Sequence, residues 1–125
     1  MKDSALNIVA VSSEGPGMDA MVDPRFGRAG GFIIADIKNN SFKYIDNGAS
    51  QLMAQGAGIG TAERMVEEGV EVVLSGYVGP KAFQALRAAD IRVCQNVDGI
   101  TVGKALEKYC AGQFSFAKAA NRQTV

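Results

Sequence analysis

The segment from Gln55 to Pro80 constrains the fold more than any other part of the chain. It runs QGAGIGTAERMVEEGVEVVLSGYVGP and predicts a glycine-rich loop, a helix, a buried strand, a second glycine-bearing loop and the start of another helix. Gly69 suits a left-handed helix end, and the β-branched run 70–74 is typical of a strand covered on both faces. Four apolar residues at helical spacing predict the helix and its buried face: Ile59, Ala62, Met65 and Val66.

Both glycine loops lead into predicted helix starts, where backbone N–H groups have no partner within the helix. Loops that join strand ends to helices form the usual binding edge of an α/β sheet. The pattern therefore predicts a site for an anion at this edge. For each loop taken alone, the alternative that its glycines only make a tight turn stays equally open.

The remaining periodic segments predict further strands over residues 6–13, 31–37, 42–46 and 91–94, and further helices over residues 80–89 and 102–110. The resulting order is β-β-β-α-β-α-β-α. A hairpin followed by alternating helices and strands predicts an α/β fold with a mixed sheet and helices on its faces. We expect one domain over residues 1–112 and a C-terminal tail over residues 113–125.

The charge balance argues against a nucleic-acid partner, because Lys plus Arg equals Asp plus Glu at 13 each and no polybasic run is present. The N-terminal residues lead into an apolar segment that is too short for a secretory signal or a membrane span. We therefore expect a cytoplasmic protein with no membrane partner.

The chain has no histidine, so the commonest general base and metal ligand is missing. Its two cysteines, Cys94 and Cys110, are not closely spaced, and no zinc or iron–sulfur ligand set can be identified within one chain. Cys94 lies in a predicted strand, where a buried structural role is favoured. Any cofactor must therefore bring most of its own ligands or be shared between chains.

Two arginines flank a Phe-Gly pair in the loop 22–29, which runs VDPRFGRA. One interpretation is an anion clamp, in which Arg25 and Arg28 donate hydrogen bonds and Phe26 forms an apolar wall. The other is a structural ion pair between one of these arginines and Asp23 or Asp36. The residues themselves leave both interpretations open.

Several enzyme motifs are excluded. The run GAGIGT at residues 56–61 resembles a dinucleotide fingerprint only in part, because it follows a polar loop and has Thr61 in place of the third glycine. No phosphate-binding Gly-Lys-Ser/Thr follows, and a Ser–His–Asp or Cys–His system is impossible without histidine. Met18, Met21 and Met53 are polarizable and suit a sulfur-rich ligand, although ordinary loop packing is the favoured interpretation of each.

The segments 22–29, 56–62 and 73–80 together resemble the dinitrogenase iron–molybdenum cofactor biosynthesis family, over about residues 8–109. The chain length is similar to that of small stand-alone members from anaerobes, one of which carries a mixed molybdenum–copper sulfide cluster in sulfate reducers. The resemblance implies a ribonuclease-H-like, three-layer α/β/α fold with a five-stranded mixed sheet and no nuclease activity. It also implies non-covalent carriage of a metal–sulfur cluster.

The resemblance also implies the site residues. Charge and donors would come from the arginine loop and from the backbone of the glycine loops: Arg25, Gly27, Arg28, Gly56, Gly58, Gly76 and Gly79. The walls would be Phe26, Met53, Ile59, Tyr77 and Val78. Many relatives have a histidine where this chain has Gln55, and an amide is a much poorer metal ligand. This departure favours an anionic thiometallate, which supplies its own sulfide ligands.

The leading hypothesis is therefore a binding protein for a metal–sulfur cluster that contains molybdenum, with or without copper. It has no enzymatic turnover, and protein donors and acceptors of the cluster are its expected partners. The alternative is a protein-interaction or regulatory module of the same fold with no bound cluster. A third hypothesis is a transferase that binds a phosphate with the glycine loop, but the sequence offers no convincing general base for it.

Overall fold

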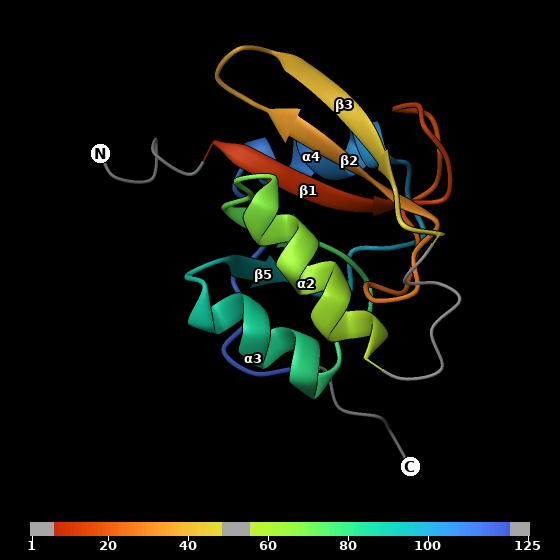
Figure 1. Ribbon diagram of the computed structural model, residues 1–125. Coiled ribbons are helices and arrows are strands. Elements are labelled where there is room, and N and C mark those ends of the chain that lie inside the picture. The colour runs from red at the N-terminus through yellow and green to blue at the C-terminus, as the bar shows by residue number, and fades with distance from the viewer. Residues whose placement is uncertain (1–6, 49–55, 121–125) are drawn as a thin grey trace.

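Five strands form one mixed sheet at the centre of the molecule (Figure 1). The computed structural model describes residues 7–48 and 56–120. The strands are β1 (Ile8–Ser13), β2 (Gly31–Asp36), β3 (Ser41–Asp46), β4 (Val72–Leu74) and β5 (Arg92–Cys94), in the spatial order β3-β2-β1-β4-β5. The pairs β3–β2 and β2–β1 are antiparallel, whereas β1–β4 and β4–β5 are parallel. The predicted element order and mixed sheet are confirmed.

The parallel centre of the sheet explains the continuous apolar runs in the sequence. Val9 lies opposite Val72, and Val11 lies opposite Leu74. All four side chains are fully buried. Parallel strands of this kind are covered on both faces, so every position along them favours an apolar residue.

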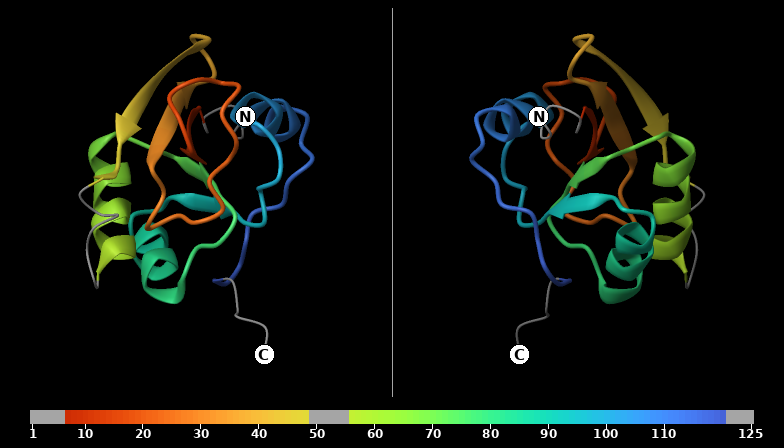
Figure 2. Two further views of the ribbon diagram at one scale, coloured as in Figure 1. Left: turned by 90° about the vertical axis from the view of Figure 1, so that its right-hand side faces the viewer. Right: turned by 90° about the vertical axis from the view of Figure 1, so that its left-hand side faces the viewer.

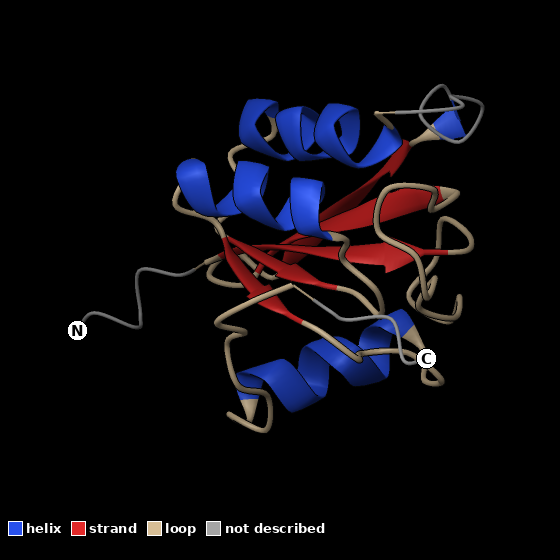
Figure 3. Ribbon diagram, turned by 90° about the horizontal axis from the view of Figure 1, so that it is seen from below, coloured by secondary structure: helices blue, strands red, loops and turns tan. Residues whose placement is uncertain are grey.

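Helices cover both faces of the sheet and give the predicted three layers (Figure 3). α2 (Ala57–Glu67) and α3 (Pro80–Ala88) lie on one face, and α4 (Val102–Cys110) lies on the other, as the side views in Figure 2 also show. Each face has its own core. Classification as ribonuclease-H-like stays a prediction. No helix in the described ranges combines the length and the apolar character needed to cross a bilayer.

The predicted buried face of α2 is only partly correct. Ile59 and Val66 are exposed by 39% and 53%, whereas the buried residues are Ala57, Thr61, Ala62 and Met65. At about 100° per residue, Ile59 and Val66 lie more than roughly 100° around the helix from the centre of that buried set. α2 packs closely against α3 as well as against the sheet: a Cβ on Gly58 would lie 3.0 Å from the Ala82 Cβ.

The strand predicted over residues 70–74 begins later, at Val72, because Glu71 has a separate role. Its Oε1 accepts hydrogen bonds from the backbone N–H groups of Asn7 and Ile8, the latter at 2.9 Å. Glu71, the one polar residue in this apolar run, therefore links the beginning of β1 to the residues just before β4.

The segment after α4 packs against the sheet as far as the structure describes it. The Ala117 N–H donates to the Val93 carbonyl at 2.7 Å, and the Arg92 guanidinium lies 4.9 Å from the centre of the Phe116 ring. Residues 113–120 therefore cover the outer side of β5. The proposed division of the chain after residue 112 stays a prediction.

A salt bridge links β3 to the end of α2. The Lys43 Nζ lies 2.7 Å from the Glu68 Oε1, and the hydrogen bond from Lys43 holds the pKa of Glu68 below its ordinary value. A carboxylate with a lowered pKa stabilises the fold above its unfolded-state pKa. That contribution is lost as the pH falls through its folded-state pKa.

We therefore expect Lys43→Gln to lower the free energy of unfolding by about 0.2–1 kcal/mol at neutral pH, where the carboxylate is charged. At a pH below the folded-state pKa of Glu68 this difference should vanish, because the carboxylate is then protonated and its pairing with Lys43 is lost. Urea denaturation of both proteins at the two pH values measures the effect. An equal difference at both values would contradict this pairing.

Candidate anion-binding site

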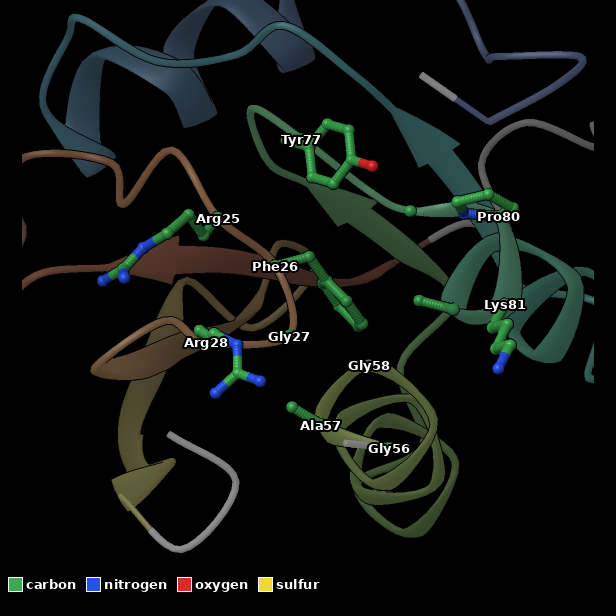
Figure 4. A pocket seen from close by; sticks show the side chains of 12 residues that line it. Arg25, Phe26, Gly27, Arg28, Gly56, Ala57, Gly58, Tyr77, Pro80 and Lys81 are labelled. Carbon is green, nitrogen blue, oxygen red and sulfur yellow. The ribbon is translucent and has the colours of Figure 1, made fainter. Parts of the chain in front are cut away.

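A pocket of about 480 Å³ opens at the edge of the sheet where the parallel strands β1 and β4 end. The loop after β1, the first turn of α2 and the connection from β4 to α3 form its walls (Figure 4). It is lined by Arg25, Phe26, Gly27, Arg28, Gly56, Ala57, Gly58, Tyr77, Gly79, Pro80, Lys81 and Ala82. The two glycine loops and the arginine loop of the sequence therefore meet at one place.

Two close backbone contacts hold these segments together. A Cβ on Gly27 would lie 2.8 Å from the Gly58 Cα, and a Cβ on Gly76 would lie 2.6 Å from the Pro24 carbonyl oxygen. Real Cβ atoms do not approach so closely, so both positions require glycine. The Tyr77 N–H also donates to the Pro24 carbonyl at 2.7 Å. The arginine loop is therefore held between the glycine loops.

Asp23 belongs to the arginine loop and stabilises it through hydrogen bonds to the loop backbone. Its side chain is almost fully buried, and its carboxylate accepts hydrogen bonds from the backbone N–H groups of Arg25 (3.0 Å) and Gly30 (3.2 Å). The Arg25 Nε lies 3.5 Å from the same carboxylate. The structural Arg–Asp interpretation is thus correct for Arg25 and Asp23. Asp36 instead accepts hydrogen bonds from Asn7 and Asn39.

Two further polar side chains hold the arginine loop by hydrogen bonds to its backbone carbonyls. The sequence did not single out either residue for this role. The Asn47 Nδ2 donates to the carbonyls of Gly27 (3.2 Å) and Ala29 (3.1 Å), and the Thr61 hydroxyl donates to the Gly27 carbonyl (3.1 Å). Both side chains are buried. Thr61, in place of the third glycine of a dinucleotide fingerprint, was the available signal, because its hydroxyl needs a partner when buried.

Phe26 anchors the loop to the core. Its side chain is fully buried, and its ring packs edge-on against Phe32 of β2, with 5.4 Å between the ring centres. Its backbone N–H donates to the Tyr77 carbonyl at 3.0 Å. Arg25 and Arg28, on either side of Phe26, are therefore carried by a backbone that is fixed to the sheet.

The charged lining of the pocket is entirely basic. It consists of Arg25, Arg28 and Lys81, with no carboxylate among the lining residues that the structure describes. The helices α2 and α3 both begin here after a glycine N-cap, with no side-chain cap and no acidic residue in the first turn. Helix N-termini carry a partial positive charge, so the pocket concentrates positive potential although the whole chain has no net charge.

The predicted site residues divide into three groups: those that line the pocket, those that do not, and one outside the described residues. Eight line the pocket: Arg25, Phe26, Gly27, Arg28, Gly56, Gly58, Tyr77 and Gly79. Gly76 is buried against Pro24, Val78 is fully buried in the core, and Ile59 is exposed outside the lining of the pocket. Met53 and Gln55 lie outside the described residues. Sequence reasoning missed Ala57, Pro80, Lys81 and Ala82, although each adjoins a predicted helix start.

No protein sulfur atom in the described ranges lines this pocket. Cys94 is buried in β5, where desolvation raises the pKa of its thiol to about 11. Cys110 is exposed at the end of α4, on the opposite face of the sheet. Across residues 7–48 and 56–120, no three His, Cys, Asp or Glu side chains gather where they could hold a metal ion.

The sequence signature of the dinitrogenase iron-molybdenum cofactor family matches residues 7–112. A search of curated proteins finds no significant match. Among solved structures, the chain is similar to the apo form of the orange protein (ORP) from Desulfovibrio gigas, with 49% identity and a TM-score of 0.92. That match covers 94% of this chain and 98% of the other.

Two further solved structures share the fold. A putative NifB protein from Thermotoga (TM1290), of the DUF35 family, is 30% identical with a TM-score of 0.82, covering 94% of this chain and 99% of that one. PH0822 is 19% identical with a TM-score of 0.71, covering 89% and 96%. At that identity, PH0822 supports the fold alone.

We expect Gly27→Ala to lower the free energy of unfolding by about 1–3 kcal/mol, because the new methyl group has no space beside Gly58. Gly15→Ala is the matched control, since its Cβ would make an ordinary 3.5 Å contact with the Ala20 Cβ. Thermal and urea denaturation compare the two variants. Equal stability would show that the arginine loop does not meet α2 so closely.

Iodoacetamide should label one thiol per folded chain, that of Cys110, and two thiols in denaturant. The reactive species is the thiolate, and the raised pKa and burial of Cys94 keep its thiol protonated and inaccessible. Intact-mass measurement counts the labels, and peptide mapping places them. Modification of Cys94 in the folded protein would contradict this assignment.

Proposed function

The chain belongs to the dinitrogenase iron-molybdenum cofactor family, and on this basis we propose that it binds and carries an anionic metal–sulfur cluster without covalent attachment. The cargo contains molybdenum, with or without copper. The protein has no catalytic turnover of its own. Donor and acceptor proteins for the cluster are its partners in this role.

The observation that carries the proposal is the combination of charge and backbone at the pocket. Its charged lining is basic, and two helices begin there without side-chain caps. By contrast, α4 begins elsewhere with Thr101, whose side chain accepts a hydrogen bond from the Lys104 N–H. Backbone N–H groups at uncapped helix starts are favourable partners for an anion.

The donor set fits a cluster that brings its own sulfide ligands. No imidazole, thiol or carboxylate lines the described pocket, so the protein offers no evident side chain for direct coordination of a metal. It offers guanidinium and backbone donors for the outer sulfur atoms, and exposed apolar surface at Tyr77 and Pro80. Polarizable, weakly hydrated sulfur suits such a mixed lining.

The described lining of the pocket includes no carboxylate, imidazole or thiol to act as a base or nucleophile, and this supports a binding role. Asp23, which is bound to the arginine loop, is buried and already accepts three hydrogen bonds from that loop. Cys94 lies in the core of the sheet. Neither side chain lines the pocket, so neither is placed to act as a base or nucleophile there.

Reconstitution tests the proposal directly. Apo protein is incubated anaerobically with tetrathiomolybdate, with and without Cu(I), and then separated from free ions by gel filtration. A coloured protein fraction with sulfide-to-metal absorption and near-stoichiometric molybdenum is the expected result. A colourless, metal-free fraction would overturn the proposal and favour the interaction-module alternative.

Removal of the loop charges should abolish retention. Arg25→Ala combined with Arg28→Ala is expected to weaken cluster binding at least about 100-fold, since hydrogen bonds from charged groups are the strong ones. Lys104→Ala combined with Lys108→Ala removes two charges from α4 on the opposite face and is the control. Circular dichroism monitors folding. Retention at the unaltered level in the arginine variant would contradict the role of this loop.

A further inference from the structure

Lys81 lies on the wall of the pocket opposite Arg28. It belongs to the first turn of α3, whereas Arg28 comes from the loop after β1 and is turned toward the first turn of α2 (Figure 4). Both residues line the pocket. The two cations therefore stand at two different helix N-termini, with Gly58 between them in the same view.

Arg25 is placed differently. Its side chain points away from Gly58 and Lys81 (Figure 4), and its Nε lies 3.5 Å from the buried Asp23 carboxylate. That carboxylate also accepts the Arg25 backbone N–H. Arg25 therefore has an anionic partner within its own loop, and both its backbone N–H and its guanidinium contact Asp23.

Lys81 occupies an electrostatically unfavourable position in the unliganded protein. A cation in the first turn of a helix is repelled by the positive end of the helix dipole. Gly79 provides no side-chain cap, the first turn has no acidic residue, and the described residues include no ion-pair partner for Lys81. Lys104, in the first turn of α4, instead has Glu107 within 3.4 Å.

We propose that Lys81 and Arg28 form the cation pair that holds the anionic cargo between the N-termini of α2 and α3, with Arg25 as a positioning residue. This assignment rests on the proposed function. It follows that a multiply charged anion contacts both walls at once. The repulsion between Lys81 and the start of α3 is relieved when that anion binds.

Lys81→Gln tests the assignment through two opposite effects. The affinity for tetrathiomolybdate with Cu(I), measured by visible titration at an ionic strength of about 0.15 M, should fall about 10- to 100-fold. The melting temperature of the apo protein should rise by about 1–4 °C, because the repulsion at the helix start is removed. A residue with a merely structural role would not change affinity and apo stability in opposite directions.

Lys104→Gln is the matched control, since it removes one lysine charge from a helix first turn on the other face of the sheet. Its affinity should stay within about twofold of the unaltered protein, because solvent and salt screen a charge so far from the pocket. Arg25→Gln should reduce apo stability, in contrast to Lys81→Gln, because it leaves the buried Asp23 carboxylate with one partner fewer.

The outcomes separate the two levels of inference. If the unaltered protein takes up no thiometallate, the proposed function is wrong and the assignment of Lys81 fails with it. If the unaltered protein binds and Lys81→Gln binds as Lys104→Gln does, the assignment alone is overturned. If Arg25→Gln lowers affinity as strongly as Lys81→Gln at unchanged apo stability, Arg25 contacts the cargo and the proposed division of roles is wrong.

Discussion

The arginine loop lies against α2 and the β4–α3 connection at distances that leave no space for a Cβ. Gly27 meets Gly58 in this way, and Gly76 meets Pro24. Because both contacts join backbone to backbone, segments that are far apart in the chain form one rigid wall. Phe26 then fixes that wall to the core through Phe32. The position of every polar group in the pocket depends on this arrangement.

These backbone contacts also bring positive charges together in the pocket. Basic side chains and two helix N-termini face the same space, and the nearby carboxylate of Asp23 is already committed to the loop itself. Such an arrangement does not optimise the stability of the unliganded protein, since like charges are brought together. It is favourable once an anion is present. A binding site can depart from locally optimal electrostatics because the rest of the fold stabilises it.

Under the proposed function, the way the cargo is held also determines how it can leave. If protein thiolates coordinated the metal, each metal–sulfur bond to this protein would have to be broken during transfer of the cluster. Hydrogen bonds and charge contacts can instead be replaced one by one by those of an acceptor protein. The buried thiol of Cys94 and the distant thiol of Cys110 leave the second mode as the one that fits this pocket. A pocket lined by hydrogen-bond donors therefore suits a carrier better than a set of metal-coordinating side chains would.

Local features of the sequence were sufficient for the element order, the buried central strands and the glycine loops at helix starts. Glycine, proline and apolar periodicity act over a few neighbouring residues, and their effect does not require knowledge of distant contacts. Local periodicity was insufficient for the inward face of α2. There, α2 packs against both the sheet and α3, which buries Ala57, Thr61, Ala62 and Met65 and leaves Ile59 and Val66 exposed.

The sequence by itself therefore determined the α/β order, the basic and glycine-rich character of the site, and the lack of histidine for catalysis or coordination. Only the tertiary structure decided that Arg25 pairs with Asp23, that both cysteines lie away from the pocket, and that Lys81 faces it. The physical reason is that ion pairing and pocket lining depend on distances between elements. Those distances are set by the packing of α2 and α3 on the sheet, which no local pattern specifies.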